Sequence, residues 1–180
     1  MEMNASDNRC RLIAGPGERF GAIRDEILSG WDNPACRKRA MFGPQRETDA
    51  IFLRYTPDSS HAPRLTEKGP IDTYYSLHGY DVIDAEEASL FPETVRWLRE
   101  MGDRLLGHLQ RAVMLGLRPG SYVHKHIDLG SHYVCRDRYH LVVKSERSPA
   151  YVDGRWYEWR EGELWWLNNK LPHGAHNPGK

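Results

Sequence analysis

Two histidines and an aspartate in the second half of the chain could together bind a redox metal. His126 and Asp128 are separated by one residue, and His173 lies near the end of the 180-residue sequence. Two imidazoles and one carboxylate are the ligands of non-haem Fe(II) centres, where the remaining coordination positions stay open. Residues i and i+2 of an extended strand face the same side, so His126 and Asp128 could approach one ion while His173 arrives from a distant strand. The open positions would admit an oxygen donor and O2, as in a catalytic rather than a structural site.

Histidines gather in the same third of the chain, since six of the nine lie between His124 and His176. Histidine is the commonest metal ligand, so this clustering favours a metal site without selecting the metal. His124 is a rival ligand because it also has same-face spacing with His126. We expect His124 to lie beside the ligands or face the substrate, and His176 to be solvated.

The first part of the chain has apolar residues at helical spacing, and the second part has them at the spacing of strands. Pro92 and Glu93 begin a segment with apolar residues at helical spacing, which predicts a helix over residues 91–102. A second helix is predicted over 18–28 and strands over 11–14 and 50–55, followed by a loop at 55–70.

From residue 107 onward the apolar period changes to two, which is typical of strands. Pro119-Gly120 predicts a turn, and Asp153-Gly154 predicts a hairpin between 150–152 and 156–159. Further strands are predicted over 138–144 and 163–167. We therefore expect a mainly β protein with flanking helices (α+β), whose antiparallel strands form a barrel or jelly-roll.

Composition limits the partners and the compartment. Twenty-five basic residues balance 25 acidic ones, so we expect neither nucleic acid nor an anionic membrane as a partner. No apolar run approaches the roughly 18 residues of a membrane span, and the polar N-terminus does not resemble a secretory signal. Cys10, Cys36 and Cys135 form no Cys-x-x-Cys pattern, which favours a reducing cytoplasm. The oligomeric state stays open.

Several motifs in fixed order carry a resemblance that covers residues 45–180. They are Leu117-Arg118-Pro119-Gly120, His126-Ile127-Asp128, Arg138-Tyr139-His140-Leu141, the run from Glu161 to Asn169, and His173 with Asn177. With these motifs the chain resembles the aspartyl/asparaginyl β-hydroxylase family of Fe(II)- and 2-oxoglutarate-dependent dioxygenases. The resemblance implies a double-stranded β-helix, a cupin-like jelly-roll.

The same resemblance implies roles for individual residues. His126, Asp128 and His173 would bind Fe(II), while Arg138 and His140 would hold 2-oxoglutarate. A guanidinium can bind a carboxylate through two parallel hydrogen bonds, which suits Arg138 to this role. Two alternatives stay open: Arg138 could form a surface salt bridge, and His140 could be a core histidine. With O2 as co-reactant, the implied reaction hydroxylates a C–H bond of an amino acid, free or within a peptide or protein.

The chain departs from the family at its end. Family members continue past the distal histidine into a strand with a second arginine, whereas this sequence ends at Lys180. We expect one domain over 1–180, with a helical and strand support region at 1–106 and a metal-binding β-core at 107–180. The β-core is expected to lack its last strand. Either the sequence is truncated, or the cosubstrate carboxylate is bound without a second arginine, by Arg138 or by Arg138 and Lys180 together.

Two other functions stay open at this point. A non-catalytic cupin-like protein could bind a metal or another ligand through the same histidines, and His173 with Asn177 matches a cupin-like His-x-x-x-Asn pattern. A zinc hydrolase fits less well, because no glutamate placed as a general base accompanies the ligands. Formation of succinate that depends on 2-oxoglutarate would distinguish the oxygenase from both.

Other side chains have both a structural and a functional interpretation. Alternating tryptophans on strands usually fill a core, and we expect this for Trp156, Trp159, Trp165 and Trp166. Asn168 and Asn169 could form a simple turn or contact substrate. A polar approach to the pocket is expected near Gln45, Thr48 and Arg54. Arg54 could bind a substrate carboxylate or form a surface ion pair.

Overall fold

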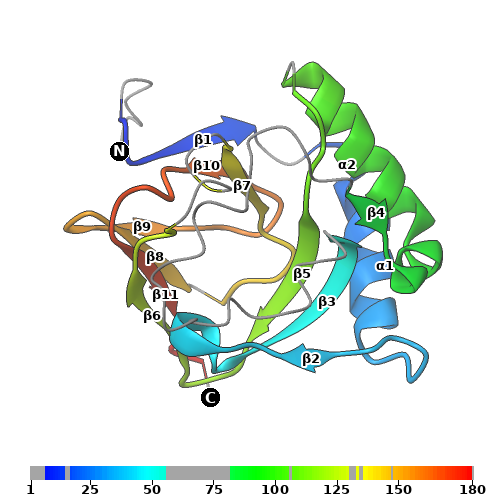
Figure 1. Ribbon diagram of the computed structural model, residues 1–180, viewed down its shortest axis with the longest axis horizontal. Helices are drawn as coiled ribbons and strands as arrows, with labels where there is room; N and C mark the ends of the chain where they lie inside the picture. Colours follow the sequence, from blue (N-terminus) through cyan, green and yellow to red (C-terminus); the bar gives the residue numbers. More distant parts are fainter. Residues whose placement is uncertain are drawn as a thin grey trace, which may run out of the picture. The chain divides into compact units, whose positions relative to one another are not determined.

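The computed structural model describes residues 7–14, 17–55, 82–105, 107–129, 133, 136–146 and 148–179. Within these residues the protein is mainly β, with two α-helices and several antiparallel sheets, so the predicted fold class is confirmed at this level (Figure 1). Most of the predicted loop at 55–70 lies outside the described residues, as do His132, Cys135 and Lys180. No helix in the described part of the chain is long and apolar enough to cross a membrane.

The chain divides into two compact units. The first holds Met1–Gly21, Ala40–Asp49 and Gly116–Lys180, and the second holds Ala22–Arg39 and Ala50–Leu115. The helices are α1 (Phe20–Trp31) and α2 (Pro92–Arg104), with short 3-10 turns at Gly43–Gln45 and Glu86–Leu90. The strands are β1 (Cys10–Ala14), β2 (Arg39–Ala40), β3 (Thr48–Tyr55), β4 (Ile83–Asp84), β5 (Ala112–Leu117), β6 (Tyr122–His126), β7 (Arg138–Leu141), β8 (Pro149–Val152), β9 (Arg155–Glu158), β10 (Leu164–Leu167) and β11 (His173–His176).

Both predicted helices are present, but each extends further than expected. The prediction that the first helix ends at residue 28 is wrong, because α1 continues to Trp31. Gly30 is a packing position rather than a helix stop, since a Cβ there would clash with the ring of Phe91. Helix α2 begins at Pro92 as predicted and ends at Arg104. Its first N–H groups, from Glu93 and Thr94, donate to the carboxylate of Glu26, a favourable position for an anion.

The first unit contains two antiparallel sheets. One has the strand order β1-β10-β7 and the other β6-β11-β8-β9. The predicted hairpin is confirmed: β8 and β9 pair across Asp153 and Gly154, whose positive φ angles of 43° and 83° are those of a tight hairpin turn. Strand β7 is shorter than predicted, because the chain bends after Leu141 and places Val142 in the core.

A cluster of buried residues joins these strands, consisting of Cys10, Val142, Val152, Tyr157, Trp165 and Leu167. Trp159 packs on this cluster and stacks on Trp165, so the core prediction holds for these two tryptophans. It is wrong for Trp156, which is 51% exposed, and for Trp166, which lies under Arg11 and donates to Asp137. Neighbouring residues of a strand face opposite sides, and Tyr157 and Trp165 take the core positions.

Candidate metal centre

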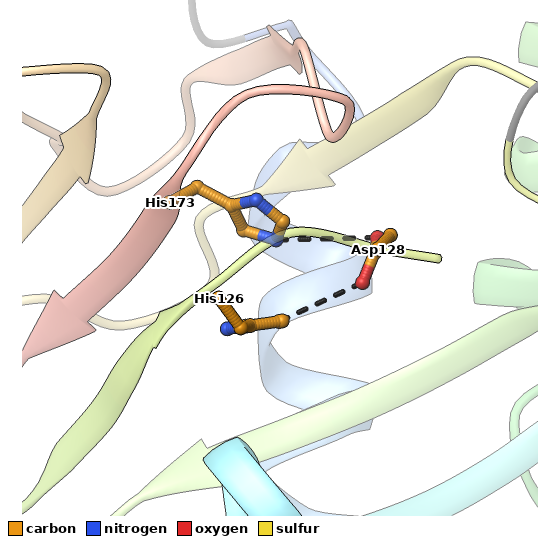
Figure 2. Close-up of side chains that lie close together, drawn as sticks. All are labelled: His126, Asp128 and His173. Atoms are coloured by element: carbon orange, nitrogen blue, oxygen red, sulfur yellow. Dashed lines mark ion pairs between the residues drawn. The ribbon is translucent and has the colours of Figure 1, made fainter. Parts of the chain in front are cut away.

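The three predicted ligands lie together in the first unit (Figure 2). His126 is the last residue of β6, His173 is the first of β11, and the two are directly paired across the sheet. Asp128 lies two residues beyond the end of β6. One ligand atom from each residue lies within 4.8 Å of the others, with His126 Nε2 3.6 Å from Asp128 Oδ1 and His173 Nε2 3.9 Å from Asp128 Oδ2.

A bulge and a glycine set the register that brings these strands together. The pairing of β11 with β6 shifts between His173 and Ala175. A Cβ on Gly174 would lie 2.7 Å from the carbonyl oxygen of Val123, closer than side chains approach a backbone. Glycine therefore permits the close contact of the two strands beside the candidate site. Nothing in the sequence pattern alone marked this residue.

Backbone carbonyls fix the orientation of both imidazoles. His126 Nδ1 lies 2.7 Å from the carbonyl oxygen of His124, and His173 Nδ1 lies 2.9 Å from that of Leu171. A carbonyl only accepts, so each Nδ1 carries the hydrogen and each Nε2 presents its lone pair toward Asp128. Burial lowers the pKa of His173, with nearby His126 acting in the same direction. With Nδ1 bonded to a carbonyl, each ring is oriented so that its Nε2 could serve as a metal ligand.

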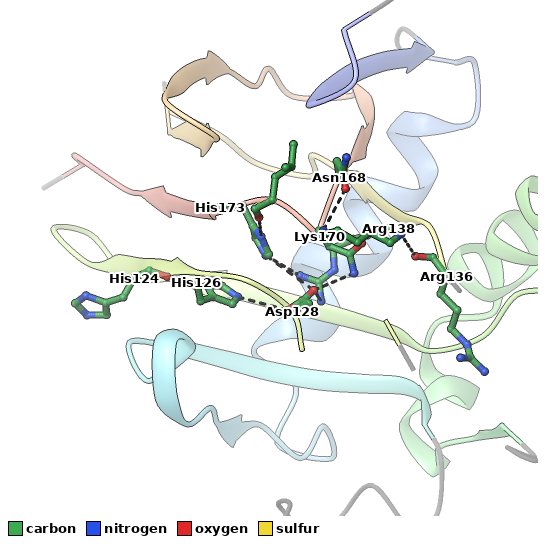
Figure 3. A network of polar contacts seen from close by, with 10 residues as sticks. His124, His126, Asp128, Arg136, Arg138, Asn168, Lys170 and His173 are labelled. Carbon is green, nitrogen blue, oxygen red and sulfur yellow. Dashed lines mark hydrogen bonds and ion pairs between the residues drawn. The ribbon is translucent and has the colours of Figure 1, made fainter. Parts of the chain in front are cut away.

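The Asp128 carboxylate contacts an arginine and an asparagine. Its side chain is 8% exposed, and its Oδ2 lies 2.8 Å from Arg138 Nη2 (Figure 3). Asn169 Nδ2 donates to the same oxygen over 3.1 Å, and the backbone N–H of Asp128 donates to the carbonyl of Asn169. The Asp128 carboxylate is thus fixed in place by Arg138 and Asn169. Asn169 was expected only as part of a turn or as a substrate contact.

Arg138 and His140 both come from β7, where residues two apart face the same side. Arg138 contacts Asp128 and places Nη1 3.4 Å from His173 Nε2, so it lies at the candidate centre. The ring of His140 lies 5.0 Å from the ring of Trp159, and its buried Nε2 has no hydrogen-bond partner among the described residues. Burial lowers the pKa of His140 to about 3, with the charges of Arg138 and His173 adding to the effect.

The rival histidines make other contacts. His124 Nε2 lies 2.7 Å from Glu47 Oε1, and Glu47 also accepts the backbone N–H of Tyr122. His176 stacks on Tyr122, with ring centroids 4.1 Å apart, rather than lying free in solvent. Glu47 carried no signal in the sequence that linked it to His124.

The remaining polar candidates make local contacts. Arg54 pairs with Asp84 and donates to the carbonyl of Gln110, which favours the ion-pair interpretation. Thr48 is buried and donates to the carbonyl of Gln45 over 2.7 Å. Asn177 donates to the carbonyl of Leu117.

The sequence was compared with curated proteins and with models of protein families. No curated protein matches the chain. The family model described as Aspartyl/Asparaginyl beta-hydroxylase matches residues 45–180, the range that carries the sequence motifs and all the residues of the candidate centre. Since this match spans more than half of the sequence, the chain belongs to the aspartyl/asparaginyl beta-hydroxylase family.

Proposed function

We propose that the protein is an Fe(II)- and 2-oxoglutarate-dependent dioxygenase that hydroxylates a C–H bond of an amino acid, free or within a peptide or protein. Membership of a hydroxylase family supports this assignment. The observation that carries it is the convergence of His126, Asp128 and His173, whose ligand atoms lie within 4.8 Å of one another. Two imidazoles and one carboxylate suit Fe(II) and leave positions for reactants.

The orientation of the three side chains in the protein suits the binding of an iron ion. His126 and His173 would bind through Nε2, because their Nδ1 atoms donate to backbone carbonyls. Asp128 would supply a carboxylate oxygen and one negative charge. When bound, iron and 2-oxoglutarate supply the oxidative chemistry, in which substrate, 2-oxoglutarate and O2 give hydroxylated substrate, succinate and CO2.

Arg138 and His140 are the proposed cosubstrate residues. The guanidinium of Arg138 lies at the candidate centre, where it could donate two hydrogen bonds to a carboxylate. His140 stays neutral at pH 7, since burial lowers its pKa to about 3. Its buried Nε2 lacks a partner among the described residues, and such an atom is costly unless a ligand satisfies it. This supports His140 as a hydrogen-bonding contact to the cosubstrate.

We also propose that the first unit has the double-stranded β-helix arrangement of the family. The two antiparallel sheets β1-β10-β7 and β6-β11-β8-β9, with the candidate ligands at strand ends, support it. Burial of the surrounding strands would exclude water from the reactants. The amino-acid or peptide substrate and the cytoplasmic location stay predictions.

Succinate formation tests the proposed reaction. Protein purified without oxygen is given Fe(II), 2-oxoglutarate and air, with a panel of amino acids and peptides. We expect succinate to require iron, to increase with the correct substrate, and to disappear in His126→Ala. His108→Ala is the matched control, because His108 is exposed and outside the candidate centre. Absence of succinate from iron-loaded wild-type protein would refute the reaction and favour a non-catalytic cupin-like role.

A further inference from the structure

We propose that Asn169 is a positioning residue that fixes the Asp128 carboxylate for metal binding. This inference rests on the metal site proposed above. Asn169 lies in the segment between β10 and β11, and Asp128 follows β6. Neither residue is close to the other in sequence, yet two hydrogen bonds join them.

The two hydrogen bonds restrain both the backbone and the side chain of Asp128. The backbone N–H of Asp128 donates to the Asn169 carbonyl over 3.1 Å, which joins the segment after β6 to the segment that leads into β11. Asn169 Nδ2 donates to Asp128 Oδ2 over 3.1 Å. The first bond uses the backbone carbonyl of Asn169 and does not depend on its side chain, whereas the second depends on the side-chain amide. The role of the amide can therefore be tested separately.

The amide selects one carboxylate oxygen. Oδ2 accepts a hydrogen bond from Asn169 and forms an ion pair with Arg138, while Oδ1 has no hydrogen-bond donor among the described residues and lies 3.6 Å from His126 Nε2. A carboxylate that is held at one oxygen cannot rotate freely about its Cβ–Cγ bond. Oδ1 thus stays directed toward the histidine ligands, in the position from which it can bind an ion.

Stability alone does not account for asparagine here. Asn169 is 1% exposed, and its Oδ1 is buried without a hydrogen-bond partner among the described residues. A buried unpaired amide oxygen opposes folding, and leucine, which has a similar shape, would remove that unfavourable group. A polar residue that is half satisfied in a core is expected where function requires it.

Asn168 supplies a matched comparison one residue earlier. Its Oδ1 accepts the backbone N–H of Lys170 (Figure 3), so its side chain forms the predicted turn. Its Nδ2 donates to the carbonyl of Asn8. None of these contacts involves Asp128. A substitution of Asn168 should therefore affect the turn and the folding stability, while a substitution of Asn169 should affect the metal.

The test measures metal affinity and folding in the full chain. Mn(II) is titrated calorimetrically into wild type, His126→Ala, Asn169→Leu, Asn169→Ala and Asn168→Leu, and the metal-free melting temperature is recorded for each. The visible spectrum of the Co(II)-loaded proteins reports ligand geometry. We expect Asn169→Leu and Asn169→Ala to bind Mn(II) roughly 10–100-fold more weakly than wild type and to change the Co(II) spectrum. Asn168→Leu should bind as wild type does.

Different results separate the two proposals. If wild type and His126→Ala bind Mn(II) equally weakly, the metal site is refuted and the role of Asn169 with it. If wild type binds tightly, His126→Ala does not, and both Asn169 variants keep wild-type affinity and spectrum, only the role of Asn169 is overturned. A purely structural role is shown if the Asn169 and Asn168 variants lose affinity in equal proportion to their melting temperatures. If Asn169→Leu does not fold, the comparison is made with Asn169→Ala.

Discussion

Replacing Gly174 by alanine should weaken both the fold and the metal site. The added Cβ would lie 2.7 Å from the Val123 carbonyl oxygen, 3.4 Å from the Lys125 nitrogen and 3.5 Å from the His124 carbonyl carbon. All three atoms belong to the backbone of β6, so no side chain can move aside. Overpacking costs about 1–3 kcal/mol, and an obstacle made of backbone favours the upper end. About 3 kcal/mol is roughly a hundredfold change in the folding equilibrium.

The same clash should displace His173 from His126, because their pairing lies next to Gly174. Urea unfolding followed by tryptophan fluorescence gives the free energy of unfolding, and Mn(II) calorimetry gives the affinity. We expect Gly174→Ala to lose about 2–3 kcal/mol of stability and about tenfold in affinity. Gly21→Ala is the control, because a Cβ there meets no atom within 4 Å. Equal unfolding free energies and affinities for Gly174→Ala and wild type would refute the proposed close packing.

Two further predictions concern the proposed cosubstrate residues. Arg138→Ala should raise the 2-oxoglutarate concentration needed for half-maximal succinate formation by the equivalent of about 1.5–3 kcal/mol, the contribution of a charged hydrogen bond; an unchanged requirement would place the carboxylate clamp elsewhere. Since the pKa of His140 falls from 6.5 in the unfolded chain to about 3 in the fold, the unfolded state binds more protons between these values. The free energy of unfolding should therefore decrease as the pH falls from 6.5 to about 3. Urea titrations at several pH values should show a smaller decrease for His140→Gln than for wild type. The same pH dependence in both proteins would contradict the low pKa of His140.

Local signals in the sequence predicted much of the fold. The Asp153-Gly154 hairpin was predictable because few residue pairs accept two positive φ angles, and α2 because Pro92 begins a helical period. The end of α1 was not predictable, since Gly30 inside a helix looks like a stop until its contact with Phe91 is known.

Local signals in the sequence also pointed to part of the candidate site. Residue type and spacing singled out His126, Asp128 and His173 as candidate ligands, because few residue types bind metals, and the structure brings these three together. Asn169 and Glu47 support their partners through hydrogen bonds between distant segments, and asparagine or glutamate in a polar stretch has many other uses. Such contacts depend on the register of strands, which composition and periodicity do not determine.

On the proposed function, His126, Asp128 and His173 together bind one metal ion. The most direct test is an anaerobic Fe(II) titration of wild type, His126→Ala, Asp128→Ala and His173→Ala, with the His108→Ala variant as control. We predict one ion per chain for wild type and the control, and a loss of tight binding in each of the three variants while circular dichroism shows that they fold. Undiminished binding of Fe(II) by all three variants would show that these residues do not bind the metal.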